Sequence, residues 1–210
     1  MKTKLILFDF DGTLVDSKSI LIQLYNELAE QKGYKLLTAD IVDYLRNVTI
    51  KERCEYLGIS LYRIPFIANR LIKGVYSKIS LLEFNEEVKE LLSSLNKDGC
   101  SYCIVSTNAK KNIETFFKEQ QLSVPEIYTS SKVFGKDVLL KKVLKTKKLH
   151  PEEVLYVGDE ARDIEACQKC NIPIAWVSWG YDSYTAIDKL EPTYKVDTLK
   201  ELLNLIKQIR

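Results

Sequence analysis

Histidine is nearly absent from this sequence, which limits the chemistry that it can perform. His150 is the only histidine among 210 residues, so hydrolases and nucleases built on two or more histidines are excluded. A Ser-His-Asp site would have to use His150, which precedes Pro151 in a polar connection and has no nucleophile-elbow sequence to serve. Glycine is also scarce, and the 8 glycines form neither a Walker-type loop nor a dinucleotide-binding fingerprint. Any chemistry must therefore depend on carboxylates, lysine and hydroxyl groups.

Long hydrophobic runs and a strong net charge are also missing. The longest apolar runs, such as Leu5–Phe8, have four residues, too few to span a bilayer. The 31 Lys and Arg residues nearly balance the 29 Asp and Glu residues, and a net charge of +2 does not predict a nucleic-acid or membrane partner. No cleavable signal is expected at the N-terminus, and an odd number of cysteines, five, favours reduced thiols. We therefore expect a cytoplasmic protein, as a monomer or a homodimer.

The order of apolar and polar segments predicts an α/β fold. Short buried strands alternate with amphipathic helices, which implies a Rossmann-like parallel sheet with helices on both faces. Strands are expected at 5–8, 102–106, 126–129, 154–157, 174–177 and 195–196. Helices are expected at 86–97, 110–120, 136–148 and 162–170, and after a capping box at 198–201.

A purely helical insertion interrupts this pattern after the first strand. Helices are predicted at 17–32, in a short segment capped by Thr38, from the capping box at 49–52 to Gly58, and at 65–78. No convincing strand occurs between them. We therefore predict two domains, an α/β core of residues 1–15 and 82–210 and a helical cap of residues 16–81.

Polar residues follow several of the predicted strands at the edge where parallel sheets bind ligands. Three or four carboxylates converging there would repel one another without a cation, and carboxylates with a phosphate substrate suit Mg²⁺. The set has the parts needed for phosphoryl transfer: a nucleophile, an acid or base, a cation and phosphate-holding donors. Its members are Asp9, Asp11, Ser106, Thr107, Asn108, Lys136, Asp159, Glu160 and Asp163.

These residues resemble the four motifs of the haloacid dehalogenase-like hydrolase superfamily, most of whose members are Mg²⁺-dependent phosphatases. Asp9–Thr13 is similar to the first motif, Thr107-Asn108 to the second, Lys136 to the third, and Gly158-Asp159 with Asp163 to the fourth. The resemblance covers essentially the whole chain. The insertion resembles the helical cap of the phosphoglycolate phosphatase-like branch, and Val177–Tyr181 resembles a loop common in that branch.

The resemblance implies a role for each matching residue. Asp9 would attack phosphorus, and Asp11 would protonate the leaving group and then activate water. Mg²⁺ would be held by Asp9, the main-chain carbonyl of Asp11 and Asp159, with Asp163 orienting metal-bound water. Thr107, the Asn108 backbone amide and Lys136 would bind the phosphate oxygens.

Some positions depart from the family pattern or allow a second interpretation. Asp137 follows Lys136 where many relatives have proline, and Lys132 is a nearby competitor for the same role. Asp163 lies in the first turn of a helix, where an acid is also favourable for purely structural reasons. Glu160 is expected to face solvent rather than the metal. Candidate cap residues for substrate specificity are Arg46, Asn47 and Lys51, with solvent exposure as an equal alternative.

Two further features are expected to be structural. Cys100 with Cys103, and Cys167 with Cys170, form CxxC pairs that would suit zinc, but their places on a strand and a helix favour core packing. Trp176 is predicted to fill the core, and the role of Trp179 is left open.

The predicted function is a Mg²⁺-dependent phosphatase that hydrolyses a small-molecule phosphomonoester through an aspartyl-phosphate. A helical cap over the site favours a small phosphorylated metabolite over a phosphoprotein. The alternatives are a phosphosugar mutase or pyrophosphatase with the same motifs, and a catalytically silent phosphate-binding regulatory protein.

Overall fold

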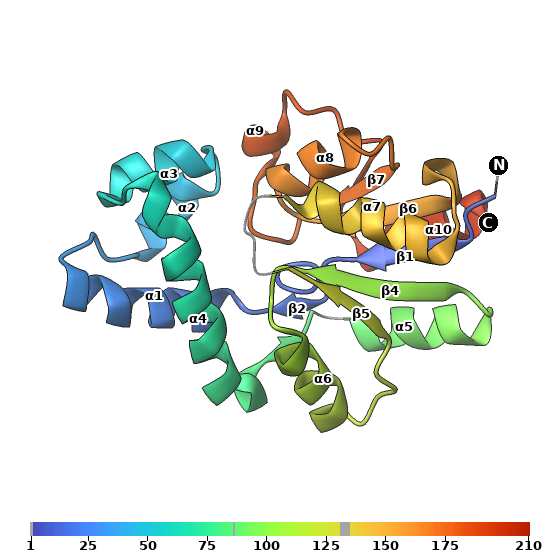
Figure 1. Ribbon diagram of the computed structural model, residues 1–210, viewed down its shortest axis with the longest axis horizontal. Coiled ribbons are helices and arrows are strands. Elements are labelled where there is room, and N and C mark those ends of the chain that lie inside the picture. The colour runs from blue at the N-terminus through green and yellow to red at the C-terminus, as the bar shows by residue number, and fades with distance from the viewer. Residues whose placement is uncertain (1, 86, 131–134) are drawn as a thin grey trace.

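A six-stranded parallel sheet forms the centre of the core in the computed structural model, which describes residues 2–85, 87–130 and 135–210. The strand order is β5-β4-β1-β6-β7-β8, so the first strand lies in the middle (Figure 1). This confirms the predicted α/β fold. The strands are β1 (Leu5–Phe8), β4 (Ser101–Ser106), β5 (Glu126–Thr129), β6 (Val154–Gly158), β7 (Ile174–Val177) and β8 (Tyr194–Val196).

Helices cover both faces of the sheet, because successive side chains of a strand point to opposite faces. Ile6 and Phe8 of β1 pack in one apolar cluster with the first group of helices, and Leu5 and Leu7 pack in a second cluster with the other group. The first group comprises α5 (Val88–Lys97), α6 (Lys110–Glu119) and α10 (Leu199–Ile209). The second comprises α7 (Lys136–Lys147), α8 (Ala161–Gln168) and α9 (Tyr184–Ile187).

The inserted segment forms a separate helical layer beside the core (Figure 1). Its helices pack around a cluster of their own that includes Tyr25, Leu45 and Leu57. The predicted capping box at Thr49 and Glu52 is present, and Gly33 and Gly58 end their helices with positive φ angles of 69° and 73°. The helices are α1 (Lys18–Lys32), α2 (Ala39–Leu45), α3 (Ile50–Leu57) and α4 (Ile64–Ser77), with 3₁₀ turns at Leu61–Arg63 and Ile79–Leu81.

A two-stranded antiparallel ribbon, missed by the sequence analysis, joins cap and core. Its strands β2 (Val15–Asp16) and β3 (Glu83–Phe84) pair where the chain leaves the sheet and where it returns. The prediction that residues 16–81 are purely helical is therefore wrong at Asp16, because a two-residue strand is too short to show a period. The proposed boundary at 15/16 falls inside β2, and the proposed boundary at 81/82 lies just before β3. Among the described residues, no helix has the length and apolar character needed to cross a membrane.

Candidate active site

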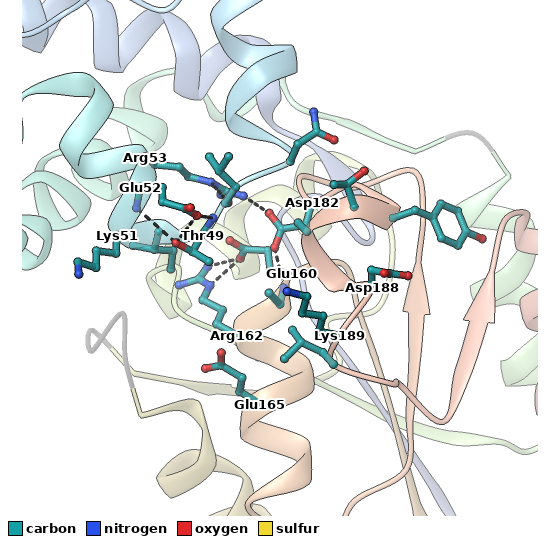
Figure 2. Close-up of a pocket in the computed structure, with 18 residues that line it drawn as sticks. Thr49, Lys51, Glu52, Arg53, Glu160, Arg162, Glu165, Asp182, Asp188 and Lys189 are labelled. Atoms are coloured by element: carbon teal, nitrogen blue, oxygen red, sulfur yellow. Dashed lines mark hydrogen bonds and ion pairs between the residues drawn. The ribbon is translucent and has the colours of Figure 1, made fainter.

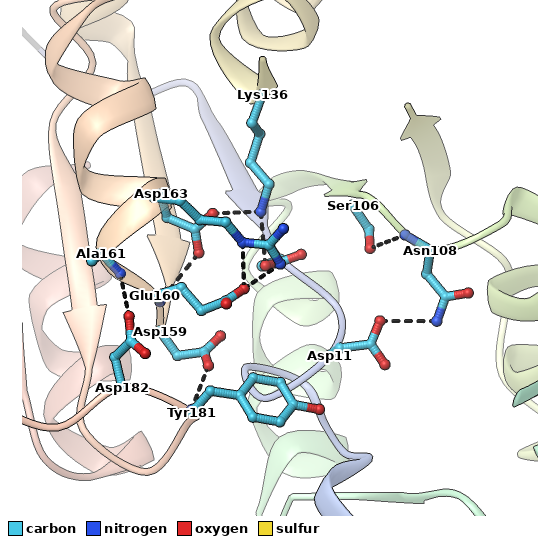
Figure 3. Close-up of polar contacts among 12 residues, drawn as sticks. Asp11, Ser106, Asn108, Lys136, Asp159, Glu160, Ala161, Asp163, Tyr181 and Asp182 are labelled. Atoms are coloured by element: carbon cyan, nitrogen blue, oxygen red, sulfur yellow. Dashed lines mark hydrogen bonds and ion pairs between the residues drawn. The ribbon is translucent and has the colours of Figure 1, made fainter. Parts of the chain in front are cut away.

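Side chains from three adjacent strands converge at the carboxyl-terminal edge of the sheet. Asp9 and Asp11 follow β1, Asn108 follows β4, and Asp159 follows β6. Lys136 points into the same region from the first turn of α7 (Figure 3). The parallel strand order β4-β1-β6 brings together residues about 150 positions apart in the sequence, as predicted.

Asp9 is buried and pairs with Lys136. One carboxylate oxygen accepts a hydrogen bond from the Phe10 amide at 2.8 Å, and the other accepts one from Lys136 Nζ at 2.8 Å. Burial raises the pKa of Asp9, and the positive charge of Lys136 opposes that rise. The lysine therefore favours the ionised carboxylate that a nucleophile must have.

Lys136 forms ion pairs with both Asp9 and Asp163 although it is only 3% exposed. It also donates to the Tyr156 hydroxyl at 2.9 Å. Burial lowers the pKa of Lys136, but Asp163 and Asp9 raise it by more, so the amine stays charged. The structure thus places Lys136 beside the expected nucleophile, whereas its competitor Lys132 lies outside the described residues.

A cluster of three buried carboxylates lies next to this lysine. Asp9, Asp159 and Asp163 each offer an oxygen atom, and these atoms all lie within 4.8 Å of one another. Burial raises the pKa of Asp159 well above its ordinary value, and the charges of Glu160, Asp9 and Asp163 add to that effect. Closely spaced carboxylate oxygens with raised pKa values are a donor set that fits a hard divalent cation.

Two glycines allow the main chain to approach Asp159 closely. A Cβ at Gly12 would lie 2.4 Å from an Asp159 carboxylate oxygen, and one at Gly180 would lie 2.0 Å from the Asp159 Cβ. The carboxylate also accepts hydrogen bonds from the Thr13 hydroxyl and the Tyr181 amide, both at 2.7 Å. The segments around Gly12 and Gly180 therefore fix the position of Asp159.

Asp163 makes contacts that fit both interpretations made from the sequence. One of its oxygens accepts from Lys136 Nζ, and the other accepts from the Glu160 amide at 3.3 Å, which is a capping contact at the start of α8. Burial raises the pKa of Asp163, and Lys136 opposes this. The same carboxylate thus caps a helix and belongs to the acidic cluster.

Asp11 is half-buried and held from two sides. Its carboxylate accepts a hydrogen bond from the Ser17 hydroxyl at 2.8 Å. It accepts another from the Asn108 side-chain amide at 2.9 Å (Figure 3). Burial raises the pKa of Asp11, which favours the protonated form that a general acid needs. Sequence reasoning assigned Asn108 through its backbone amide. In the structure that amide donates to the Ser106 hydroxyl at 3.0 Å, and Thr107 lies half-buried beside it.

Ser17 and Tyr181 belong to the site but were not found from the sequence. Their hydroxyl oxygens are 2.6 Å apart, and the Ser17 hydroxyl donates a hydrogen bond to the Asp11 carboxylate. Trp179 lies in the same loop as Tyr181, and its indole NH donates to the Thr13 carbonyl at 3.0 Å. The unassigned Trp179 therefore ties this loop to the first motif. The only sequence signal was the resemblance of residues 177–181 to a loop of the family.

The three cap candidates have different surroundings. Arg46 donates to the main-chain carbonyls of Tyr181 at 3.2 Å and Gly180 at 3.3 Å. Asn47 accepts from the Ser183 hydroxyl at 2.7 Å. For Lys51 the structure agrees with the alternative of solvent exposure, because its side chain is 71% exposed and pairs with Glu55, one helical turn along α3.

Arg53, on α3 two residues after Lys51, was overlooked and contacts the core through an ion pair. It forms an ion pair with the buried Asp182, which also accepts from the Ala161 amide at 2.7 Å. The pair lies in a cleft of about 810 Å³ between α3 and the α8–α9 side of the core (Figure 2). Asp182 thus links the cap to the helix that carries Asp163.

Glu160 does not face solvent as predicted. It is only 9% exposed and forms an ion pair with Arg162 at the base of the same cleft (Figure 2). The reason is local, because Glu160 is the N-cap of α8 and Arg162 lies two residues later on its first turn.

The cysteines and Trp176 pack in the core, as predicted. All five thiols are free and buried, with Cys100 and Cys103 in clusters on opposite faces of the sheet. Burial raises the pKa of Cys103 to about 11, so its thiol stays protonated. Trp176 is fully buried and donates to the main-chain carbonyl of Asp159 at 2.8 Å, which helps to hold that motif in place.

Comparisons with known proteins agree with this geometry. The chain is 27% identical over 206 residues to a phosphoglycolate phosphatase of Synechococcus elongatus, with 97% of each chain covered. It is 25% identical over 215 residues to the pyrophosphatase PpaX of Bacillus mycoides, covering 100% of this chain and 99% of the relative. A haloacid dehalogenase-like family hydrolase from Streptococcus pneumoniae has the same fold, with a TM-score of 0.77, 19% identity and coverage of 97% and 98%.

The family match extends over most of the chain. Residues 6–177 match the family described as haloacid dehalogenase-like hydrolase, a span that begins in β1 and ends with β7. It therefore contains Asp9, Asp11, Asp159, Asp163, Lys136 and the whole cap. The protein is an enzyme that belongs to the haloacid dehalogenase-like hydrolase family.

Proposed function

We propose that this hydrolase is a Mg²⁺-dependent phosphatase that hydrolyses a small-molecule phosphomonoester through an aspartyl-phosphate on Asp9. The observation that carries the proposal is the pairing of two carboxylates in different environments. Asp9 is buried against the charged Lys136, whereas Asp11 is held by neutral hydrogen-bond donors, Ser17 and Asn108. Such a difference separates a nucleophile from a general acid.

The reaction divides into two steps on these side chains. In the first, an Asp9 oxygen bonds to phosphorus, the bond from phosphorus to the leaving oxygen breaks, and Asp11 gives its proton to that oxygen. In the second, Asp11 takes a proton from water, which attacks phosphorus and releases inorganic phosphate and the Asp9 carboxylate. Thr107, the Asn108 amide and Lys136 are proposed to hold the phosphate oxygens.

The acidic cluster is the proposed metal site. Asp9, Asp159 and the main-chain carbonyl of Asp11 would hold Mg²⁺, and Asp163 would orient its water ligands. A divalent ion there supplies positive charge that stabilises the phosphoryl group as its negative charge develops. Buried carboxylate oxygens within 4.8 Å of one another support this assignment.

The names of the relatives support a phosphatase acting on small compounds. One is a phosphoglycolate phosphatase and the other a pyrophosphatase, and each matches this chain over nearly its full length. A phosphate-binding protein without catalytic activity would not need Asp11, nor Ser17 and Asn108, which hold its carboxylate. A mutase would accumulate a long-lived phosphoenzyme, which a phosphatase does not.

Phosphate release from a panel of phosphorylated metabolites tests the proposal. Activity should require Mg²⁺, stop in excess chelator and disappear in Asp9→Asn. Asp16→Asn, a change of the same type at an exposed position of β2, should keep it. Undiminished turnover in chelator, or equal activity of the two variants, would refute the proposal.

A further inference from the structure

The cap contains an apolar pocket of about 250 Å³ whose lining includes Tyr181 of the core. Its walls come from all four cap helices. Leu21 and Ile22 of α1, Val42 and Leu45 of α2, Leu57 of α3 and Leu71 of α4 line it. Of the core residues that the structure describes, Tyr181 lines the pocket, and it comes from the loop that also holds Asp159.

The pocket also has cations on its wall, but each already has a partner within the protein. Lys18 donates to the Trp179 carbonyl at 2.7 Å. Arg46 donates to the carbonyls of Gly180 and Tyr181, and Arg53 pairs with Asp182.

The hydroxyl groups of the two pocket tyrosines also have hydrogen-bond partners within the protein. Tyr25 donates to the Lys35 carbonyl at 3.0 Å, and the Tyr181 hydroxyl lies 2.6 Å from the Ser17 oxygen. An anionic group entering the pocket would have to break one of these contacts or remain unpaired among hydrocarbon side chains, which is costly. An apolar group needs no such partner.

Two hydrogen bonds connect the pocket to Asp11. The Tyr181 hydroxyl contacts Ser17, and Ser17 donates to the Asp11 carboxylate at 2.8 Å (Figure 3 shows Asp11 and Tyr181). Asp11 is the group proposed to protonate the leaving oxygen. A leaving group that extends from Asp11 on the side of Ser17 would meet Tyr181 and then the pocket.

From this arrangement we infer that the pocket binds the leaving group of the substrate and that the preferred substrates are monophosphate esters with an uncharged apolar alkyl or aryl group. The inference rests on the proposed phosphatase function and specifies its substrate class. It separates this chain from the activities printed in the names of its relatives, because the leaving groups from phosphoglycolate and pyrophosphate are small and anionic.

A series of n-alkyl phosphates from ethyl to hexyl tests the inference on the unmodified protein. Burying one methylene should raise kcat/KM roughly fourfold, so hexyl phosphate should exceed ethyl phosphate by on the order of 10²-fold. Hexyl phosphate should also exceed phosphoglycolate. A flat series, or a preference for phosphoglycolate over every alkyl ester, would overturn the inference while leaving the phosphatase proposal intact.

Two variants test whether the gain in kcat/KM with chain length arises in this pocket. Leu71→Trp adds bulk inside the pocket and should abolish the gain in kcat/KM with chain length, so that hexyl phosphate is turned over no better than ethyl phosphate. Leu61→Trp makes the same change at a cap position that is 48% exposed and is not among the pocket residues, so it should preserve the series. Equal responses of the two variants would argue against this pocket.

Binding without turnover separates the two proposals. Hexylphosphonate and ethylphosphonate cannot be hydrolysed, so calorimetry measures the pocket whether or not the protein is a phosphatase. Tighter binding of hexylphosphonate, lost in Leu71→Trp, would support the pocket even if no ester were cleaved. Equal binding of the two phosphonates would overturn it.

Discussion

Replacing Asp159 by asparagine should stabilise the metal-free protein and remove most of its response to Mg²⁺. Asp159 is fully buried, and its carboxylate lies in a cluster with Asp9 and Asp163. Asparagine has nearly the same shape and can still bond to Thr13 and the Tyr181 amide, so the change removes mainly charge.

The distances between the three carboxylates determine how much Asp159→Asn should stabilise the metal-free protein. Two like charges 4.8 Å apart repel by about 3 kcal/mol at an effective dielectric constant of about 20, and Asp159 has two such neighbours. Lys136 offsets part of this repulsion through its pairs with Asp9 and Asp163. We expect a net gain of about 2 kcal/mol in unfolding free energy, or a rise in Tm of about 4–8 °C for a chain of this size.

Thermal unfolding with excess chelator and then with saturating Mg²⁺ measures both effects. The unmodified protein should gain about 2.7 kcal/mol at a Mg²⁺ concentration 100 times its Kd, and Asp159→Asn should gain much less. Because the folded-state pKa of Asp159 is raised, the penalty grows as pH rises above the ordinary carboxyl range, so the advantage of the variant should vanish near pH 4. A lower Tm for the variant in chelator at pH 7 would refute the reasoning.

Three further predictions follow from the same contacts. Lys136→Met should cost about 3–5 kcal/mol of stability in chelator by removing the ion pairs with the buried Asp9 and Asp163, whereas Lys142→Met on the exposed face of α7 should cost little in the same unfolding assay. Gly180→Ala should weaken Mg²⁺ binding by roughly 10–100-fold in calorimetry, because its Cβ would displace the Asp159 side chain, and unchanged affinity would contradict this. For alkyl esters, kcat should fall as pH rises through the raised pKa of Asp11, because the acid form is lost, and an aryl phosphate should show a weaker fall in its pH profile.

Most of the core fold could be predicted because its signals are local. Leu5–Phe8 and Val154–Val157 are continuous apolar runs, as a parallel strand covered on both faces requires, and their order implies crossover helices. The ribbon of β2 and β3 could not be found in this way. Each of its strands has two residues, and their pairing joins segments on either side of the cap.

The site residues, too, could be predicted where their signals are local and could not where they depend on distant contacts. Asp9, Asp11, Asp159 and Lys136 could be placed at one edge of the sheet because each lies just after a strand or begins a helix that the pattern predicts. The contact between Ser17 and Tyr181 spans 164 positions and depends on how the cap linker meets the loop after β7.

Cap contacts were harder to predict because helical position alone does not say which face meets the core. Lys51 and Arg53 are two residues apart on α3, yet Lys51 is exposed whereas Arg53 pairs with the buried Asp182. Glu160 was predicted to face solvent because charged side chains are mostly exposed. Its ion pair with Arg162 allows it to be buried instead.

The central claim is that Asp9 carries the phosphoryl group during turnover. Rapid mixing of Asp11→Asn with an aryl phosphate, followed by acid quench and mass spectrometry of the peptides, tests it most directly. An aryl leaving group needs little protonation, so the first step should survive while hydrolysis slows by about 10²–10⁴-fold. We predict a stoichiometric burst and one added phosphoryl group on Asp9. A phosphoryl group on Ser106 or Thr107, or near-normal turnover by Asp9→Asn, would contradict the mechanism.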